Sequence, residues 1–131
     1  MIPPAVLIVD DEPSVRAFAQ QALSAAGYRT HQAASGPHAL SLIEMRGSFD
    51  ICLIDLMMPE MGGTELAQRI RRLLPSVKIL YFTGYADQLF TEKRRLWEGE
   101  AFIEKPSTIN GLREAVSLLL YGHTRGPLAP A

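Results

Sequence analysis

Short apolar runs alternate along the chain with stretches in which apolar residues recur three and four positions apart. Runs this short, rich in Val, Ile and Phe and bounded by Gly or Pro, are typical of β-strands, whereas the longer spacing is typical of one face of an α-helix. The expected strands lie at residues 5–9, 28–33, 51–56, 77–82 and 101–104. The first two expected helices run from about Ser14 to Gly27 and from Ser35 to Gly47. The third begins at a Thr64 cap and ends at Pro75, and the fourth covers Asp87–Trp97 and is expected to bury Leu89, Phe90 and Leu96. The last begins at a Ser107 or Thr108 cap and runs to Leu120.

This alternation predicts an α/β fold: a doubly wound, flavodoxin-like (βα)5 sandwich whose parallel strands are joined by right-handed crossovers. The runs at 6–9 and 51–53 are continuously apolar, as central strands buried on both faces should be. The run at 28–33 contains Arg29, His31 and Gln32 and is expected at an edge. A five-stranded sheet of order 2-1-3-4-5 satisfies these conditions, and ligands then bind beyond the carboxyl ends of the first and third strands.

Length and composition agree with one globular unit. The chain has 131 residues, and we expect a single domain over residues 1–121 followed by a disordered tail over 122–131. The formal net charge of −1 argues against direct nucleic-acid binding. No apolar stretch approaches the ~20 residues that span a bilayer, and no signal peptide is evident, so we expect a cytoplasmic protein without membrane insertion. One cysteine excludes an intramolecular disulfide framework.

Acidic residues follow two of the expected strands. The first strand leads into Asp10-Asp11-Glu12 and the third leads to Asp55, so the predicted order brings these carboxylates to one crevice. Their mutual repulsion costs stability, and a hard divalent cation such as Mg²⁺ would relieve it. Alternatively, the acids only cap the helix that starts near Ser14, which would explain Glu12 and one aspartate but not Asp55.

Two further strand ends add donors to the same edge. The fourth strand ends in Thr83-Gly84 and the fifth in Lys105-Pro106. Taken alone, Thr83 is compatible with a strand-end turn and Lys105 with a surface lysine. Together with the acids they suggest phosphoryl transfer: a carboxylate nucleophile, a metal, two donors for phosphoryl oxygens, and Gly84 where a phosphoryl group would approach the backbone.

On these residues the chain resembles the receiver domain of two-component response regulators, over Ala5 to Leu120. The tripeptide Thr83-Gly84-Tyr85 and residues 99–106 look more like receivers of hybrid sensor kinases than like those of transcription factors. The matching features, in chain order, are Asp10-Asp11, Asp55, Met58-Pro59, Met61, Gly63, Thr83 and Lys105-Pro106.

The resemblance implies that Asp55 accepts a phosphoryl group from the phosphohistidine of a sensor histidine kinase or a histidine phosphotransfer protein. It implies Mg²⁺, for which Mn²⁺ can substitute, held by Asp11, Asp55 and the backbone carbonyl of Met57. Asp10 would act on the metal largely through water.

The resemblance also implies a switch around the phosphoryl group, made of Thr83, Gly84, Phe102, Lys105 and Pro106. Thr83 and Lys105 would bond phosphoryl oxygens. Phe102 falls where the family keeps an aromatic switch residue, although it has no hydroxyl. Phosphorylation would then change the face made by the fourth helix, the fifth strand and the fifth helix.

We therefore expect a phosphorelay switch that catalyses only its own phosphorylation and dephosphorylation, either stand-alone or part of a larger kinase, with an unknown downstream target. A phosphorylation-dependent homodimer is left open. The alternative is a haloacid-dehalogenase-like, Mg-dependent phosphatase, which wants Asp-x-Asp after its first strand, where this chain has Asp10 and Glu12. A flavodoxin-like cofactor binder is a third option, but three acids in that loop would repel a phosphate.

Overall fold

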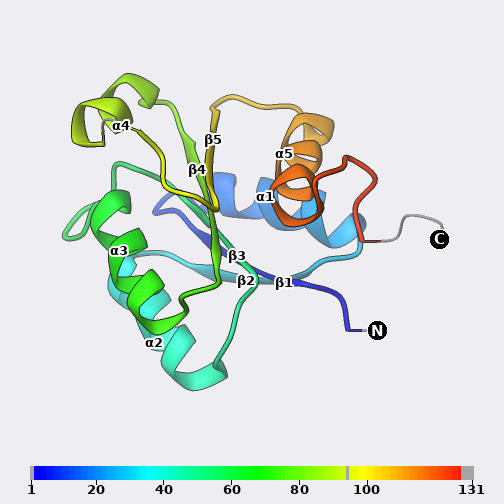
Figure 1. Cartoon of the computed structure of the whole chain (residues 1–131), viewed down its shortest axis with the longest axis horizontal. Coiled ribbons are helices and arrows are strands. Elements are labelled where there is room, and N and C mark those ends of the chain that lie inside the picture. The colour runs from blue at the N-terminus through cyan, green and yellow to red at the C-terminus, as the bar shows by residue number, and fades with distance from the viewer. Residues whose placement is uncertain (1, 94, 128–131) are drawn as a thin grey trace.

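The computed structural model describes residues 2–93 and 95–127, and within them five strands alternate with five helices (Figure 1). The strands are β1 (Ala5–Val9), β2 (Arg29–Ala33), β3 (Ile51–Ile54), β4 (Lys78–Thr83) and β5 (Glu100–Glu104). The helices are α1 (Pro13–Ala25), α2 (Gly36–Arg46), α3 (Gly63–Leu73), α4 (Ala86–Glu92) and α5 (Ile109–Tyr121).

The strands pair in parallel in one sheet of order β2-β1-β3-β4-β5. Strands β1 and β3 are buried along their whole length, whereas β2 is partly exposed at the edge. Val9 of β1 lies opposite Ile54 of β3, so the residues that follow them, Asp10 and Asp55, leave the sheet side by side. The predicted fold and strand order are confirmed.

Helices cover both faces of the sheet (Figure 1). Helices α1 and α5 pack on one face, where the apolar core includes Leu23 and Val116. Helices α2, α3 and α4 pack on the other, where it includes Ile43, Ile70 and Leu89. Within the described part of the chain, we find no helix with the length and apolar character needed to cross a membrane. The two layers of helices leave the carboxyl edge of the sheet as the place where the strand-end residues gather.

Helix α3 begins one residue before the predicted Thr64 cap. Its N-cap is Gly62, and the Gly63 N–H donates to the Leu56 carbonyl at 2.8 Å. Without a Cβ at Gly63, the helix start can pack directly on the backbone of Asp55 and Leu56. Thr64 is therefore inside the first turn, and its hydroxyl donates to Glu92 at 2.6 Å instead of capping the helix.

Helix α4 is shorter than predicted and ends at Glu92, so its extension to Trp97 was wrong. Lys93 has an extended backbone, and its side chain turns inward to pair with Glu100 at 2.7 Å. Of the apolar residues expected to be buried, Leu89 is buried, Leu96 is partly buried and Phe90 is 41% exposed.

The chain after α5 folds back on that helix over its described part. Gly122 ends α5 in a left-handed conformation. The buried Ser117 hydroxyl donates to the His123 carbonyl and accepts from the Gly126 N–H at 2.9 Å. Residues 128–131 of the expected disordered tail lie outside the described residues, so the predicted domain boundary stays a prediction.

Candidate functional site

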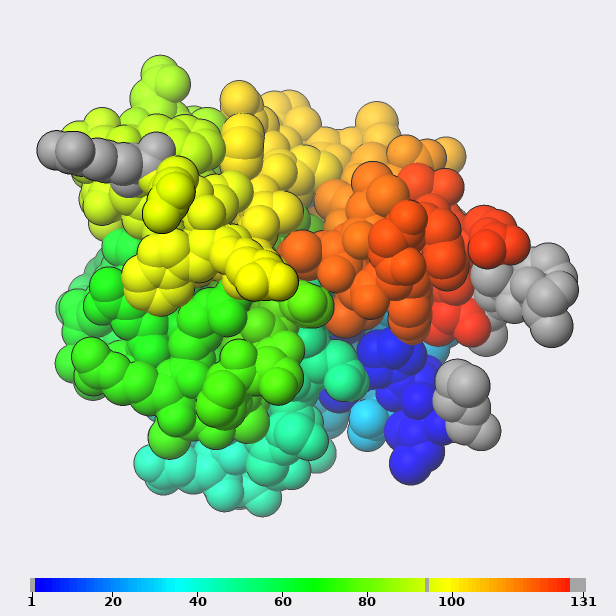
Figure 2. Space-filling model, in the orientation of Figure 1, coloured from blue at the N-terminus to red at the C-terminus, as the bar shows by residue number. Residues whose placement is uncertain are grey.

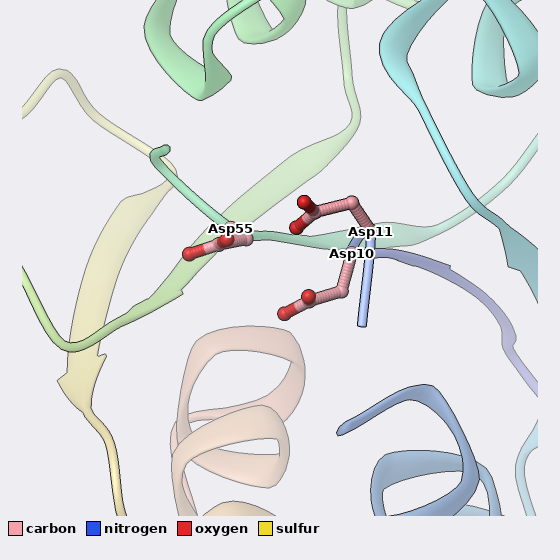
Figure 3. A group of neighbouring side chains, drawn as sticks. All are labelled: Asp10, Asp11 and Asp55. Atoms are coloured by element: carbon pink, nitrogen blue, oxygen red, sulfur yellow. The ribbon is translucent and has the colours of Figure 1, made fainter. Parts of the chain in front are cut away.

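Three aspartates meet at the carboxyl ends of β1 and β3. One carboxylate oxygen from each of Asp10, Asp11 and Asp55 lies within 4.8 Å of the others. Figure 3 shows the Asp10 and Asp11 side chains, at the end of β1, directed to the side on which Asp55 lies. Asp10 is 2% exposed and Asp55 7%, whereas Asp11 is open to solvent. The convergence of carboxylates expected from the strand order is present for these three aspartates, whereas Glu12 is not part of the group.

Lys105 joins this cluster from the end of β5. Its ammonium lies 2.7 Å from Asp10 Oδ2 and 3.5 Å from Asp55 Oδ1, and it therefore bridges the two buried carboxylates. Burial alone would lower the pKa of Lys105, but the hydrogen bond to Asp10 and the charges of both carboxylates outweigh it and raise that pKa. The backbone N–H of Lys105 donates to the Thr83 carbonyl at 3.0 Å, and the Lys105–Pro106 peptide bond is cis. The two carboxylate contacts hold the Lys105 ammonium within reach of Asp55.

The positive charge of Lys105 does not compensate the negative charges of the three aspartates. Burial, and after it the charge of Asp10, raise the pKa of Asp55 to about 6, against the opposing effect of Lys105. The free protein therefore disfavours the charged form of Asp55, and a divalent cation would favour it. Carboxylate oxygens together with solvent on the Asp11 side are a donor set that suits Mg²⁺.

Arg16 of α1 is a residue that the sequence analysis missed. Its Nη1 donates to the Asp10 carbonyl at 2.7 Å, and its Nε donates to the Gln32 side chain at 3.2 Å. Asp10 is also held by the Glu12 N–H, which donates to Oδ1 at 2.9 Å. No spacing signal in the sequence singles out an arginine six residues after Asp10, because the contact depends on how α1 leaves the sheet.

Thr83 and Gly84 lie at the end of β4, on the expected edge. Thr83 is fully buried, and its hydroxyl accepts from the Tyr85 N–H at 3.0 Å. A Cβ on Gly84 would meet no described atom within 4 Å, so space beside that residue is open. The structure brings Thr83 to the same edge as Lys105 through their shared backbone hydrogen bond.

Phe102, Met57 and Pro106 were also predicted to belong to the site, and they lie outside the cluster of aspartates. Phe102 of β5 is 38% exposed, and its ring meets Phe90 of α4 edge-to-face with centroids 5.3 Å apart. Met57 lies half-exposed in the loop after Asp55. Pro106 lines a cavity of about 230 Å³ beside Lys105. Their roles in metal binding and switching stay predictions.

A family model described as "Response regulator receiver domain" matches residues 6–117. This chain belongs to that family. The receiver is 36% identical over 116 residues to the sensor kinase CckA of Brucella abortus, covering 88% of this chain and 12% of the kinase. It therefore spans only a small part of the length of that relative.

Solved structures agree with the family. The crystal structure of the receiver domain from the hybrid histidine kinase CckA is 32% identical, with a TM-score of 0.75 over 88% of this chain and 98% of that one. The response regulator TrrA of Thermotoga maritima, solved in complex with Mg²⁺–BeF, is 30% identical, with a TM-score of 0.78 over 89% of this chain and 99% of that one. The chain is thus a phosphoryl-acceptor signalling domain, and the phosphatase alternative finds no support.

Gly63 of this receiver allows α3 to start against the acceptor loop. A Cβ there would overlap the Asp55 carbonyl oxygen and lie 2.9 Å from Leu56 Cα, and backbone atoms cannot move aside cheaply. We expect Gly63→Ala to lower the free energy of unfolding by about 1–3 kcal/mol in urea denaturation. Gly62→Ala is the matched control, because its Cβ would stay 3.5 Å from the nearest atom; it should cost no more than about 1 kcal/mol. Equal losses in both variants would contradict this account.

Proposed function

We propose that the Asp55 carboxylate accepts a phosphoryl group from a phosphohistidine of a sensor histidine kinase or a histidine phosphotransfer protein. An Asp55 oxygen would form the new bond to phosphorus, and the bond from phosphorus to the imidazole nitrogen would break. The observation that carries the proposal is the arrangement around Asp55: a buried carboxylate with Asp10 and Asp11 beside it and the Lys105 ammonium 3.5 Å away.

The other side chains have distinct tasks in this proposal. Lys105 would exchange part of its pairing with Asp10 and Asp55 for a phosphoryl oxygen. The Thr83 hydroxyl accepts one hydrogen bond and, among the described residues, donates none, so its proton is available to a phosphoryl oxygen. Arg16 keeps the Asp10 backbone in place while the charges in the site change.

Asp11, Asp55 and the Met57 carbonyl would hold Mg²⁺, with Asp10 acting through water. The cation supplies charge neutralisation for the carboxylates and the phosphoryl oxygens. Mn²⁺ can substitute because it takes the same oxygen ligands. As a signalling domain the chain would catalyse only its own phosphorylation and dephosphorylation.

The docking place for the phosphohistidine donor would lie next to Lys105. The cavity of about 230 Å³ between α1 and the start of the loop before α5 has mostly apolar walls. A partner helix could cover it and bring an imidazole to the acidic crevice. The cavity is lined by Ser14, Val15, Phe18, Phe82, Lys105, Pro106 and Ser107.

Incubation with acetyl phosphate tests the acceptor function without a kinase. With Mg²⁺ we expect the intact mass to rise by about one phosphoryl group, and with a chelator in place of Mg²⁺ we expect no rise, because the carboxylates then repel the donor. Intact mass spectrometry measures both. Phosphoryl uptake that is unchanged in the chelator would overturn the metal part of the proposal.

The output would be a change in the face formed by α4, β5 and α5. A phosphoryl group would draw Thr83 toward it, and Phe102, now packed on Phe90, could turn inward because a phenyl ring gains from burial. We expect a population shift, with coupling of about 1–3 kcal/mol. Beryllofluoride with Mg²⁺ should shift amide resonances from Tyr85 to Phe102; shifts confined to the crevice would contradict this output.

A further inference from the structure

Glu100, the first residue of β5, carries a buried carboxylate outside the acidic crevice. Its side chain is 0% exposed, and it is reached from three other parts of the chain. The Lys93 ammonium and the Trp97 backbone N–H each lie 2.7 Å from Oε1. The Tyr81 hydroxyl donates to Oε2 at 3.4 Å, and Arg71 Nε lies 3.8 Å from the same oxygen. A carboxylate is buried only when such partners compensate its lost hydration.

These contacts tie the segment between α4 and β5 to its neighbours. The Lys93 ammonium also lies 4.0 Å from the centre of the Trp97 ring, in cation–π geometry. Arg71 of α3 donates through Nη2 to the Glu98 carbonyl at 3.0 Å. In the space-filling view this segment, coloured yellow, lies against the green surface of α3 (Figure 2). Lys93, directly after α4, is therefore held to β5 by charge, and Glu98, farther along the segment, is held to α3 by a hydrogen bond.

The same strand face connects Glu100 with the acceptor site. Glu100 and Phe102 are two residues apart on β5, and Tyr81 and Thr83 are two residues apart on β4, with Tyr81 paired opposite Phe102. Tyr81 bonds to Glu100, and Phe102 packs on Phe90 of α4. Movement of α4 that frees Phe102 would therefore pull Lys93, one residue after α4, away from Glu100.

We propose that Glu100 and Lys93 form an ionic clamp that holds α4 on the sheet and raises the threshold for its response to a phosphoryl group at Asp55. The clamp is closed in the conformation with Phe102 packed outward on Phe90. An interaction that is made in only one conformation shifts the equilibrium toward that conformation. Removing the clamp therefore lowers the free energy needed to reach the conformation that a phosphoryl group favours. The coupling rests on the proposed function of Asp55, whereas the clamp itself does not.

Trp97 is the single tryptophan of the chain, so the tryptophan fluorescence of the protein reports on the surroundings of the clamp. The variants are Glu100→Gln, which keeps an acceptor for the Trp97 N–H, and Lys93→Met, which keeps the length of the side chain. Glu65→Gln is the control, because it breaks the exposed pair with Arg69 on α3. We expect both clamp variants to change Trp97 emission and to lower the beryllofluoride concentration for half-saturation by about fivefold or more, followed at the Gly84 amide with Mg²⁺ present.

The outcomes separate the clamp from the acceptor site. Thermal unfolding first tests whether each variant is folded. If Glu100→Gln is not folded, Lys93→Met alone is used to test the clamp. If a folded clamp variant has the same beryllofluoride concentration for half-saturation as the parent, the clamp is not coupled to the acceptor site. If that concentration is higher than in the parent, the clamp favours the response instead of opposing it. Unchanged Trp97 emission overturns the clamp itself. If beryllofluoride fails to bind even the parent, the acceptor assignment of Asp55 fails, and the coupling fails with it.

Discussion

Replacement of Asp55 by asparagine is expected to abolish phosphoryl uptake. The amide has no anionic oxygen to attack phosphorus, and Asp10, the other buried carboxylate of the acidic crevice, is held by Lys105 at 2.7 Å and by the Glu12 N–H. With acetyl phosphate and Mg²⁺, the parent should gain about one phosphoryl group in intact mass. We expect the rate for Asp55→Asn to fall by at least about a thousandfold, to background. Labelling of the variant at the parent rate would show that another residue is the acceptor.

A stability measurement on the same variant shows that it is folded and tests the electrostatics of the site. The pKa of Asp55 is raised from 3.8 to about 6, so between these values the folded state binds more protons than the unfolded state. The parent therefore loses stability as pH rises through this window, and the loss is complete above pH 6. Without metal, we expect Asp55→Asn to gain about 1–2 kcal/mol over the parent at neutral pH, and less near pH 4. An advantage that does not grow with pH would contradict this origin of the raised pKa.

The topology and the crevice could be predicted because both follow from strand order. Continuous apolar runs distinguish central strands from the edge, and parallel strands bring all their carboxyl ends to one side. Asp10, Asp55, Thr83 and Lys105 each directly follow or end a strand, so local sequence was enough to bring them together. Contacts between residues distant in sequence only set the positions of individual side chains there, such as the Lys105 ammonium between two carboxylates.

The region of α4 was predicted less well, because its structure depends on partners distant in sequence. Apolar spacing extended the helix to Trp97, but Lys93 leaves the helix to reach Glu100. Nothing local marks Glu100 as buried, since a glutamate at the start of a strand is ordinarily solvated. Its burial depends on Arg71 and Tyr81, which come from α3 and β4. For the same reason Phe90, expected in the core, instead packs on Phe102 near the surface.

Asp11 is the aspartate of the cluster that faces solvent, and its removal should have opposite effects with and without metal. Its carboxylate lies within 4.8 Å of those of Asp10 and Asp55. Without a cation it only repels them, so we expect Asp11→Ala to raise the melting temperature in a chelator. With Mg²⁺ the variant lacks one carboxylate ligand, and its dissociation constant should rise by about tenfold or more in calorimetric titration.

Glu12→Gln is the matched control for Asp11→Ala, because it removes a neighbouring negative charge that is not part of the cluster. If Asp11 is a ligand, Glu12→Gln should keep Mg²⁺ affinity within about threefold of the parent, since exposed charges act on the cation only through screened attraction. Equal losses in the two variants would mean that Mg²⁺ responds to the overall negative charge of the loop. Parent-like affinity in Asp11→Ala would instead leave Asp55 and Asp10 as the carboxylates that hold the cation. The sign of the metal-free change in melting temperature then decides whether repulsion between Asp11 and the two buried aspartates lowers the stability of the folded state.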